Sequence, residues 1–490
     1  MQLFFTDQRK VRRVGQFAGL SQAELSALFT RRPVPAGTPI LLDEAMRPVE
    51  PVSSWFRSLA LERKDAKTMR SYAYSVLMLL HFLRARDADL RSATETDLRE
   101  FRLVRQDEAE QVVGDAAWDR DWAAIESLYR FLIRTGEVAQ RPWRATPQGS
   151  GLASRIRPAL RVRHMELDQY LFLRDVGFAG LAPDAELDAS FRGWRPHRNR
   201  AACELALMTG MRIQEWSTLL LPELGLLDNR HPAFADIEVE ACAKFGRPRS
   251  VYVAPDPMEL LVPYLLFERP EIVAKAQRSL RRRHRDLFVV ERLEADDAKV
   301  RGVFDGLKVT RTIKNMKPGL RRLAVLETGD GLDPLALFIG QGGKMLTFSA
   351  WDRIRWRAWD RLKAWSGGME APVVPRRCWV YHDLRHTFAL RLLIFLTREA
   401  LNDAAGQNLP MSTLLDHMTG NPLLVVQRRL GHAHPSTTYR YIRYLKDPMR
   451  EVDAAFRQWT AAGGASYVTI ARSLMNPEEA GHAPTRSLHP

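Results

Sequence analysis

Hydrophobic residues recur at helical spacing between residues 50 and 140. The first predicted helix follows Asp65, a residue type that caps helix N-termini, and a second begins after Thr94 and Thr96 in DLREFRLVRQ. A third helix is predicted in WDRDWAAIESLYRFLIRTGEV and ends at Gly136. One face of the first helix carries Tyr72, Val76, Leu79, Leu80 and Leu83, and one face of the third carries Trp118, Trp122, Ile125, Tyr129 and Leu132. The pattern predicts a compact helical domain with basic outer faces.

The regions on either side of this domain have a different pattern. Residues 1–49 show no long period and have prolines at 33, 35 and 39, so we expect an N-terminal arm or accessory element. Residues 141–163 are rich in Pro, Gly, Ser and Arg and contain no acidic residue, which is typical of a linker that runs beside phosphates.

A second, larger and mostly helical domain is predicted over residues 164–450, followed by a tail, 451–490. Its one clear break is DIEVEACAKFGRPRSVYVAP, where apolar residues alternate on both sides of a turn that contains Gly and Pro. This pattern predicts a β-hairpin with Lys244 near its bend. The expected fold is therefore mainly α, with two domains and a small hairpin or sheet.

Composition points to a polyanionic partner. The 490 residues include 73 Lys and Arg against 58 Asp and Glu, which gives a net charge of +15 and a pI near 9.9. This charge attracts nucleic acid over long range, although codon bias in a GC-rich genome explains an excess of arginine equally well. Three separated cysteines argue against a disulfide framework and against a thiolate metal cluster. The sequence has neither an apolar run long enough to span a bilayer nor a secretory N-terminal stretch, so we expect a cytoplasmic protein.

Three segments carry candidate chemistry. In the first, TGMRIQE, Arg212 follows a Thr-Gly break and can pair with Glu215 as an ordinary helical salt bridge.

A separate glycine-rich stretch, FIGQGGKM, is not a phosphate-binding Walker loop. Phe338 and Met345 stand where such a loop requires Gly and Ser or Thr.

The second segment, YHDLRHTFALRLL, places His382, Arg385 and His386 on one helical face. The two histidines have the spacing of a zinc-binding H-E-x-x-H helix, with Asp383 in place of the glutamate. Arg385 between the two ligands would repel the metal. The alternatives are an anion clamp at a helix start and ordinary capping histidines.

The third segment is GHAHPSTTYRYIRYL. A helix ends at Gly431, His432 follows, and the next helix starts with Ser436 or Thr437 as its cap. It contains three tyrosines, Tyr439, Tyr441 and Tyr444, which would ordinarily be packing residues.

These motifs together resemble the tyrosine recombinases, the phage-integrase family. TGMRIQE, the hairpin lysine, HDLRHTFA and LGH followed by STTYRY occur in the order found there, and the resemblance covers about 400 residues. It implies that the nucleophile is Tyr441, nine positions after His432, whereas Tyr439 falls too early and Tyr444 too late. The catalytic residues that it implies are Arg212, Lys244, His382, Arg385, His432 and Tyr441, with Glu215 and His386 in support.

The resemblance also implies what these domains do. Residues 50–140 look like a core-binding domain of the SAM-like kind, which with a catalytic domain closes as a clamp around duplex DNA. The implied reaction is site-specific cleavage and rejoining of DNA through a 3′-phosphotyrosine, without ATP, metal or other cofactor. Expected partners are double-stranded DNA with inverted-repeat core sites and three further copies of the chain in a homotetramer, with nucleoid association in the cytoplasm. The expected DNA contacts come from Arg155, Arg157, Arg161, Arg163, Arg247 and Arg249.

Some features depart from the family pattern. Lys244 and His382 are 138 positions apart, and Arg385 and His432 are 47 apart, which is longer than compact members need. We expect insertions near 265–345 and 397–415. Rival functions are a type IB topoisomerase or hairpin telomere resolvase, a DNA-binding regulator without catalysis, and a zinc hydrolase.

Overall fold

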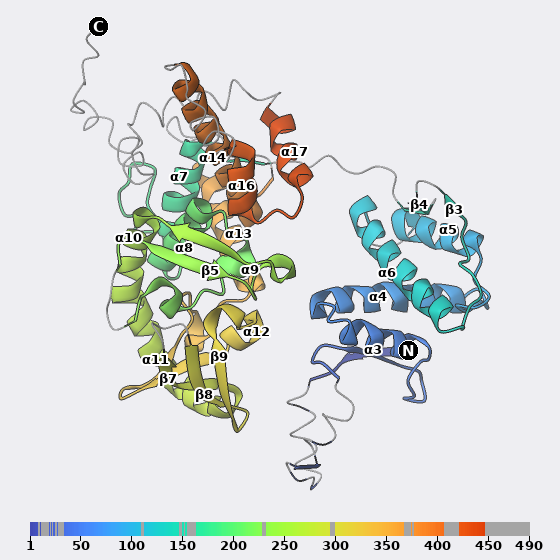
Figure 1. Ribbon diagram of the computed structural model, residues 1–490. Coiled ribbons are helices and arrows are strands. Elements are labelled where there is room, and N and C mark those ends of the chain that lie inside the picture. The colour runs from blue at the N-terminus through green and yellow to red at the C-terminus, as the bar shows by residue number, and fades with distance from the viewer. Residues whose placement is uncertain are drawn as a thin grey trace. The chain divides into compact units, whose positions relative to one another are not determined.

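The structure is a computed structural model of the chain (Figure 1). It describes residues 1–7, 34–108, 112–146, 149–150, 152–153, 163–227, 232–294, 299–366, 374, 377–405 and 421–445, and a few positions between 10 and 27. The chain divides into two compact units, Met1–Arg161 and Val162–Pro490. Within the described residues, no helix is long and apolar enough to cross a membrane.

The first unit is a bundle of helices with two small two-stranded sheets, β1-β2 and β3-β4, in its described residues. Its elements are β1 (Gln2–Phe5), β2 (Pro39–Leu42), α3 (Val52–Leu61), α4 (Ala66–Arg84), α5 (Glu95–Leu103), η1 (Val104–Glu108), α6 (Asp115–Arg134), β3 (Ala145–Thr146) and β4 (Gly149–Ser150). Asp65 caps α4 and Thr94 caps α5, as the sequence predicts, and Gly136 follows α6 at φ +76°. The apolar faces of α3, α4 and α6 form one core.

The beginning of the predicted linker belongs to this core. Trp143 is buried, with its ring centroid 4.7 Å from that of Trp122 and 5.3 Å from that of Tyr129. The carbonyl oxygen of Leu152 accepts a 2.7 Å hydrogen bond from the Trp118 indole. The connection between the units therefore starts later than composition predicts, because one large aromatic side chain anchors an otherwise polar segment.

The second unit is also mainly α, and the predicted hairpin is present. Its first part contains α7 (Leu167–Leu171), η2 (Phe172–Ala179), α8 (Pro196–Thr209), α9 (Ile213–Trp216) and η3 (Leu221–Leu224). The hairpin follows as β5 (Ala235–Val239) and β6 (Arg249–Val253), antiparallel and joined through η4 (Lys244–Gly246). The last part contains α13 (Phe348–Trp365), α14 (Tyr381–Ala405), α16 (Pro422–Leu430) and α17 (Pro435–Leu445).

A five-stranded sheet occupies the stretch that we expected to be an insertion. It follows α10 (Pro255–Pro263), η5 (Tyr264–Glu268), α11 (Arg269–Arg282) and η6 (His284–Asp286) and has the strand order β11-β10-β7-β8-β9. The strands are β7 (Phe288–Glu294), β8 (Lys299–Phe304), β9 (Leu307–Thr312), β10 (Ala324–Thr328) and β11 (Gly331–Pro334), with η7 (Ile313–Asn315) and α12 (Pro318–Arg321) between β9 and β10 and η8 (Gln341–Gly343) after β11. The sequence does not reveal this sheet because charged residues interrupt its apolar alternation, as in β9, LKVTRT.

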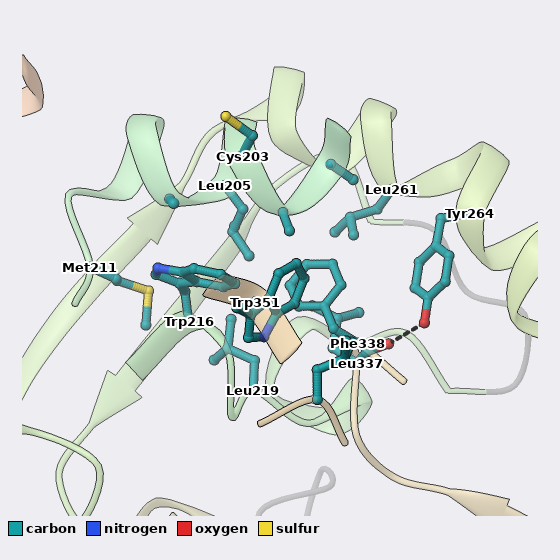
Figure 2. Packing of buried hydrophobic residues seen from close by; sticks show 14 of the residues in the cluster. Cys203, Leu205, Met211, Trp216, Leu219, Leu261, Tyr264, Leu337, Phe338 and Trp351 are labelled. Carbon is teal, nitrogen blue, oxygen red and sulfur yellow. Dashed lines mark hydrogen bonds between the residues drawn. The ribbon is translucent and has the colours of Figure 1, made fainter. Parts of the chain in front are cut away.

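An aromatic cluster fixes α9 and α13 in the core of the second unit (Figure 2). The ring centroid of Trp351 lies 4.9 Å from that of Trp216 and 5.7 Å from that of Phe338. The Tyr264 hydroxyl donates a 2.9 Å hydrogen bond to the carbonyl oxygen of Leu337, and Figure 2 shows this bond at the edge of the cluster. The short helix that begins after Arg212 is thus held by a large buried tryptophan.

Candidate active site

Arg212 stands between two helices of the core. Gly210 ends α8 in the left-handed region at φ +59°, and α9 starts one residue after Arg212. The left-handed glycine makes a tight turn of the chain just before Arg212. The Arg212 side chain is partly exposed.

Glu215 links Arg212 to the hairpin. Its carboxylate accepts hydrogen bonds from the backbone amide of Arg212 at 2.7 Å and from the Arg212 guanidinium at 3.2 Å. The guanidinium of Arg249 on β6 binds the same carboxylate through both terminal nitrogens, at 3.0 and 2.5 Å. Burial raises the pKa of Glu215, but the hydrogen bonds and charge of Arg249 hold that pKa below its usual value.

Arg249 therefore lies in the interior of the site, with 7% of its side chain exposed, rather than on an open surface. From the sequence we expect Arg249 to contact DNA. A signal for the interior position exists in the sequence, because residues 249, 251 and 253 of a strand share one face and Val251 and Val253 are buried.

Arg385 is the most deeply placed cation of the site, at 2% exposure on α14. Its guanidinium donates to the carbonyl oxygen of Gly210 at 2.6 Å and to that of Leu430, the last residue of α16. Burial, followed by the nearby charge of Arg212, lowers the pKa of Arg385 to about 9. Two arginines held close together, one of them bound to carbonyls, leave the site short of negative charge.

Three histidines surround these cations. Burial lowers the pKa of His382 to about 4 and the pKa of His386 and of His432 to about 3, and neighbouring positive charge adds to each shift. The rings of His382 and His386 meet edge to face, with centroids 4.6 Å apart. All three imidazoles are neutral at pH 7, so each can accept a proton as well as donate a hydrogen bond.

Tyr441 packs against two of these histidines, His386 and His432. It is 2% exposed, its hydroxyl lies 2.9 Å from Nδ1 of His386, and its ring stacks on that of His432 at a centroid distance of 6.2 Å. His432 is oriented in turn by a 3.0 Å hydrogen bond between its Nδ1 and the Thr438 hydroxyl. Burial raises the pKa of Tyr441, whereas the charges of Arg385 and Arg212 act to lower it.

The other two tyrosines of α17 differ from Tyr441. Tyr439 is 53% exposed, and the side chain of Tyr444 lies outside the described residues. Among the tyrosines of this helix whose side chains are described, Tyr441 is the one that reaches the arginine and histidine cluster.

Lys244 lies in η4 at the bend of the hairpin and is exposed. Its charge contributes to the lowered pKa of His382, so the bend of the hairpin lies near the start of α14. Arg247, three residues further along the same bend, is also exposed.

The remaining predicted residues lie farther from this cluster or outside the described residues. Arg163 forms a 2.7 Å ion pair with Asp383, whose carboxylate also accepts the Val380 amide at 2.9 Å. Asp383 thus holds the start of α14, and within the described ranges no group of three or more His, Cys, Asp or Glu could hold a metal ion. Arg155, Arg157 and Arg161 lie outside the described residues.

A comparison with known protein families identifies a domain in the first unit. Residues 52–136 match the family described as phage integrase, N-terminal SAM-like domain. The resemblance to tyrosine recombinases, which rests on motifs of the second unit, is therefore confirmed by a separate part of the chain. No curated protein sequence matches the chain.

Solved structures that match the chain have low sequence identity to it and low TM-scores. A XerH site-specific recombinase bound to a palindromic difH substrate is 16% identical, with a TM-score of 0.44 over 82% of this chain and 83% of that one. The Tn1549 transposon integrase in complex with circular intermediate DNA is 12% identical, with a TM-score of 0.43 over 79% of this chain and 93% of that one.

Proposed function

We propose that this chain, whose first unit matches the SAM-like domain of phage integrases, is a site-specific DNA recombinase. It would cleave and rejoin duplex DNA through a 3′-phosphotyrosine intermediate on Tyr441. The observation that carries the proposal is the position of the Tyr441 hydroxyl, which is hydrogen-bonded to His386 and lies within the field of Arg212 and Arg385.

The electrostatics of the cluster favour a phosphodiester. Arg385 has a pKa lowered to about 9 because it is buried and lies near the charge of Arg212. Glu215, which pairs with Arg212, is already shared with Arg249. A phosphodiester supplies the missing negative charge. In the five-coordinate transition state that charge grows on the nonbridging oxygens, where Arg212 and Arg385 would stabilise it most.

The cleavage step needs one nucleophile, one base and one acid. The Tyr441 oxygen attacks phosphorus, the new O–P bond forms, and the bond from phosphorus to the 5′ oxygen breaks. The phenolic proton passes to neutral His386, whose Nδ1 is 2.9 Å away. Lys244 at the bend of the hairpin donates a proton to the departing 5′ oxygen, a role that its ammonium suits better than a guanidinium. His432 and His382 donate hydrogen bonds around the phosphate.

Rejoining is the reverse reaction. A 5′ hydroxyl attacks the phosphotyrosine and returns its proton to Lys244, the O–P bond to Tyr441 breaks, and the tyrosine oxygen takes back its proton from His386. Exchange between two duplexes requires four cleavages, so we propose a homotetramer on two sites, each an inverted repeat around a spacer. The net charge of +15 suits a protein associated with the nucleoid in the cytoplasm.

The test is covalent attachment to a nicked suicide substrate that traps cleavage. Wild-type protein is expected to form a DNA adduct stable to denaturant, and Tyr441→Phe to form none while still binding the duplex. Tyr439→Phe and Tyr444→Phe serve as matched controls and keep the adduct. Removing one phenolic oxygen leaves the stacking on His432 in place, so the variant should fold.

The outcomes separate the rival functions. An adduct that persists in Tyr441→Phe and disappears in one of the control variants would place the nucleophile elsewhere. No adduct in any protein, on a verified binding site, would indicate a regulator that binds DNA without cleaving it. Relaxation of a supercoiled circle without paired sites would favour a topoisomerase.

A further inference from the structure

A second cleft lies in the second unit at the end of α8 opposite the candidate active site. It has a volume of about 1440 Å³ and is lined by the segment before α8, by α11, by the glycine-rich loop around η8, and by one face of α13. The 14 residues of α8 span about 21 Å at 1.5 Å per residue, and Arg212 follows the far end of this helix. The cleft is therefore separate from the tyrosine and arginine cluster.

The lining of this cleft is strongly cationic. Among the described lining residues Asp188 is the one acid, and the basic ones are Arg192, Arg195, Arg198, Lys275, Lys344, Arg353, Arg357 and Arg361. Asp188 is paired with Arg361 at 2.6 Å, and Glu271 beside the cleft pairs with Arg195 and Lys275. These two carboxylates leave most of the positive charge of Arg192, Arg198, Lys344, Arg353 and Arg357 in place. Such a concave surface concentrates positive potential and attracts an anion.

Arg353 and Arg357 are the clearest sign of a missing anion. Both are exposed, line the cleft and stand four residues apart on α13. Like charges at this spacing destabilise a helix. Within the described part of the chain neither forms an ion pair. The opposite face of α13 is apolar and holds the helix in the core through Trp351, Trp359 and Leu362.

Aromatic rings accompany the cations. Phe191, Trp194 and Trp365 line the cleft, and the two tryptophans are 42% and 37% exposed. The guanidinium groups of Arg195 and Arg198 lie 4.9 and 5.1 Å from the Trp194 ring centre. Exposed rings interleaved with arginines are the surface on which unpaired bases stack while phosphates bind the cations.

The segment before α8 shows a further unsatisfied group. Arg195 adopts left-handed backbone angles at φ +62°, unusual for a residue other than glycine, and pairs with Glu271 on α11. Its Nε is buried and lacks a hydrogen-bond partner. Glu271 thus holds the Arg195 guanidinium against the wall of the cleft.

We propose that this cleft binds a short stretch of single-stranded nucleic acid, separately from the duplex at the Tyr441 site. Its volume exceeds the ~300–1,000 Å³ of typical small-molecule pockets, which favours several nucleotides over a single one. Trp194 and Trp365 stack bases, and Arg353 and Arg357 bind the backbone. The proposal does not depend on the recombinase reaction.

Binding of a fluorescent deoxythymidine oligonucleotide of about 12 nucleotides, within the usual site sizes of roughly 4–16, tests this proposal on the full chain. Fluorescence anisotropy is measured in the presence of saturating duplex, so that the Tyr441 site is occupied. We expect Arg353→Glu/Arg357→Glu to weaken oligonucleotide binding about tenfold or more, because two phosphate contacts are lost. Duplex binding and the Tyr441 adduct should stay at the wild-type level.

Lys308→Glu/Arg311→Glu on β9 is the matched control, since it changes the net charge equally at exposed positions outside the cleft. It should weaken the oligonucleotide less than twofold, the size of a long-range charge effect. Photo-crosslinking with an iododeoxyuridine oligonucleotide should attach peptides that contain Trp194 or Trp365.

Equal weakening by both double variants would show that only overall charge matters and would overturn the proposal. Crosslinks confined to peptides of α14 and α17 would do the same. Displacement of the oligonucleotide by duplex would show that both nucleic acids bind at one site, which would also overturn the proposal. An acidic peptide could bind the wild-type protein and lose binding in the Arg353→Glu/Arg357→Glu variant, while the oligonucleotide binds neither protein. That result would show that the cleft binds a protein instead of nucleic acid.

Discussion

At the scale of single residues, contacts with two histidines fix the position of Tyr441, the candidate nucleophile. Tyr441 is nearly inaccessible to solvent and meets His386 through its hydroxyl and His432 through its ring face. A buried phenol beside neutral imidazoles has a proton acceptor ready, and beside arginines it has stabilisation for the resulting phenolate. The same burial that prepares the reaction makes the site sensitive to acid.

We predict that the protein loses stability as pH falls below about 6.5. In the unfolded chain His382, His386 and His432 titrate near 6.5, whereas in the fold their pKa values are about 4, 3 and 3. Between these values the unfolded state binds more protons, so the free energy of unfolding decreases with falling pH until the folded histidines also protonate. Urea unfolding at several pH values from 7.5 to about 4 measures the slope.

His386→Asn provides the comparison. It removes one of the three shifted groups, so its free energy of unfolding should fall less steeply over the same pH range. A matched change at the exposed His81, His81→Asn, should keep the wild-type slope. Identical slopes in all three proteins would show that the buried histidines do not cause the acid sensitivity.

At the scale of elements, the site depends on where helices end. α8 stops at Gly210, whose carbonyl oxygen receives Arg385, and α16 stops at Leu430, whose carbonyl oxygen receives the other side of the same guanidinium. The free carbonyls at helix C-termini are thus used to orient a cation. A change in either helix end should therefore reach the chemistry.

Gly210→Ala should be destabilising and should slow cleavage. A Cβ at this left-handed position would lie 2.3 Å from the Phe388 ring on α14, so the backbone strain is joined by a clash that displaces the helix carrying Arg385. We expect a loss of about 3 kcal/mol in the free energy of unfolding, and an adduct yield reduced well beyond the unfolded fraction.

Gly225→Ala separates the two causes. Gly225 has nearly the same φ, +63°, but its nearest neighbour to an added Cβ is Pro232 at 3.5 Å. This variant should lose only about 1 kcal/mol and keep adduct formation. Equal effects of the two changes would show that the contact with Phe388 is unimportant.

At the scale of the whole molecule, the chain has two units with separate hydrophobic cores and a net charge of +15. Each unit buries its own aromatic and aliphatic residues, and the positive charge is spread over the chain. We predict that duplex binding weakens steeply with salt, because phosphate contacts release counterions. The logarithm of the binding constant, measured by anisotropy between about 50 and 200 mM salt, should fall with a slope of magnitude about 6 or more, which corresponds to several phosphate contacts.

The fragment of the first unit alone is the matched comparison. Its slope should be smaller, because fewer cations meet the phosphates. A nearly flat dependence for the full chain would contradict a phosphate-based interface and would indicate that its charge has another role.

The sequence by itself determined the capped helices of the first unit, the hairpin of the second and the identity of the candidate residues. Asp65 and Thr94 mark helix starts because their side chains cap free amides, a property of neighbouring residues along the chain. The hairpin around Lys244 follows in the same way from period-two alternation. The motifs with Arg212, Arg385, His432 and Tyr441 were likewise visible as short strings with fixed spacing.

Only the tertiary structure decided how these strings meet and what their environment does. Arg249 was expected at a phosphate, but β6 turns it inward to Glu215, which stands 34 positions earlier. The lowered pKa values of the histidines and the contact of His386 with Tyr441 come from burial between helices distant in sequence. The five-stranded sheet and the cationic cleft have the same origin: strand pairing and concavity depend on contacts between distant residues, which local periodicity does not encode.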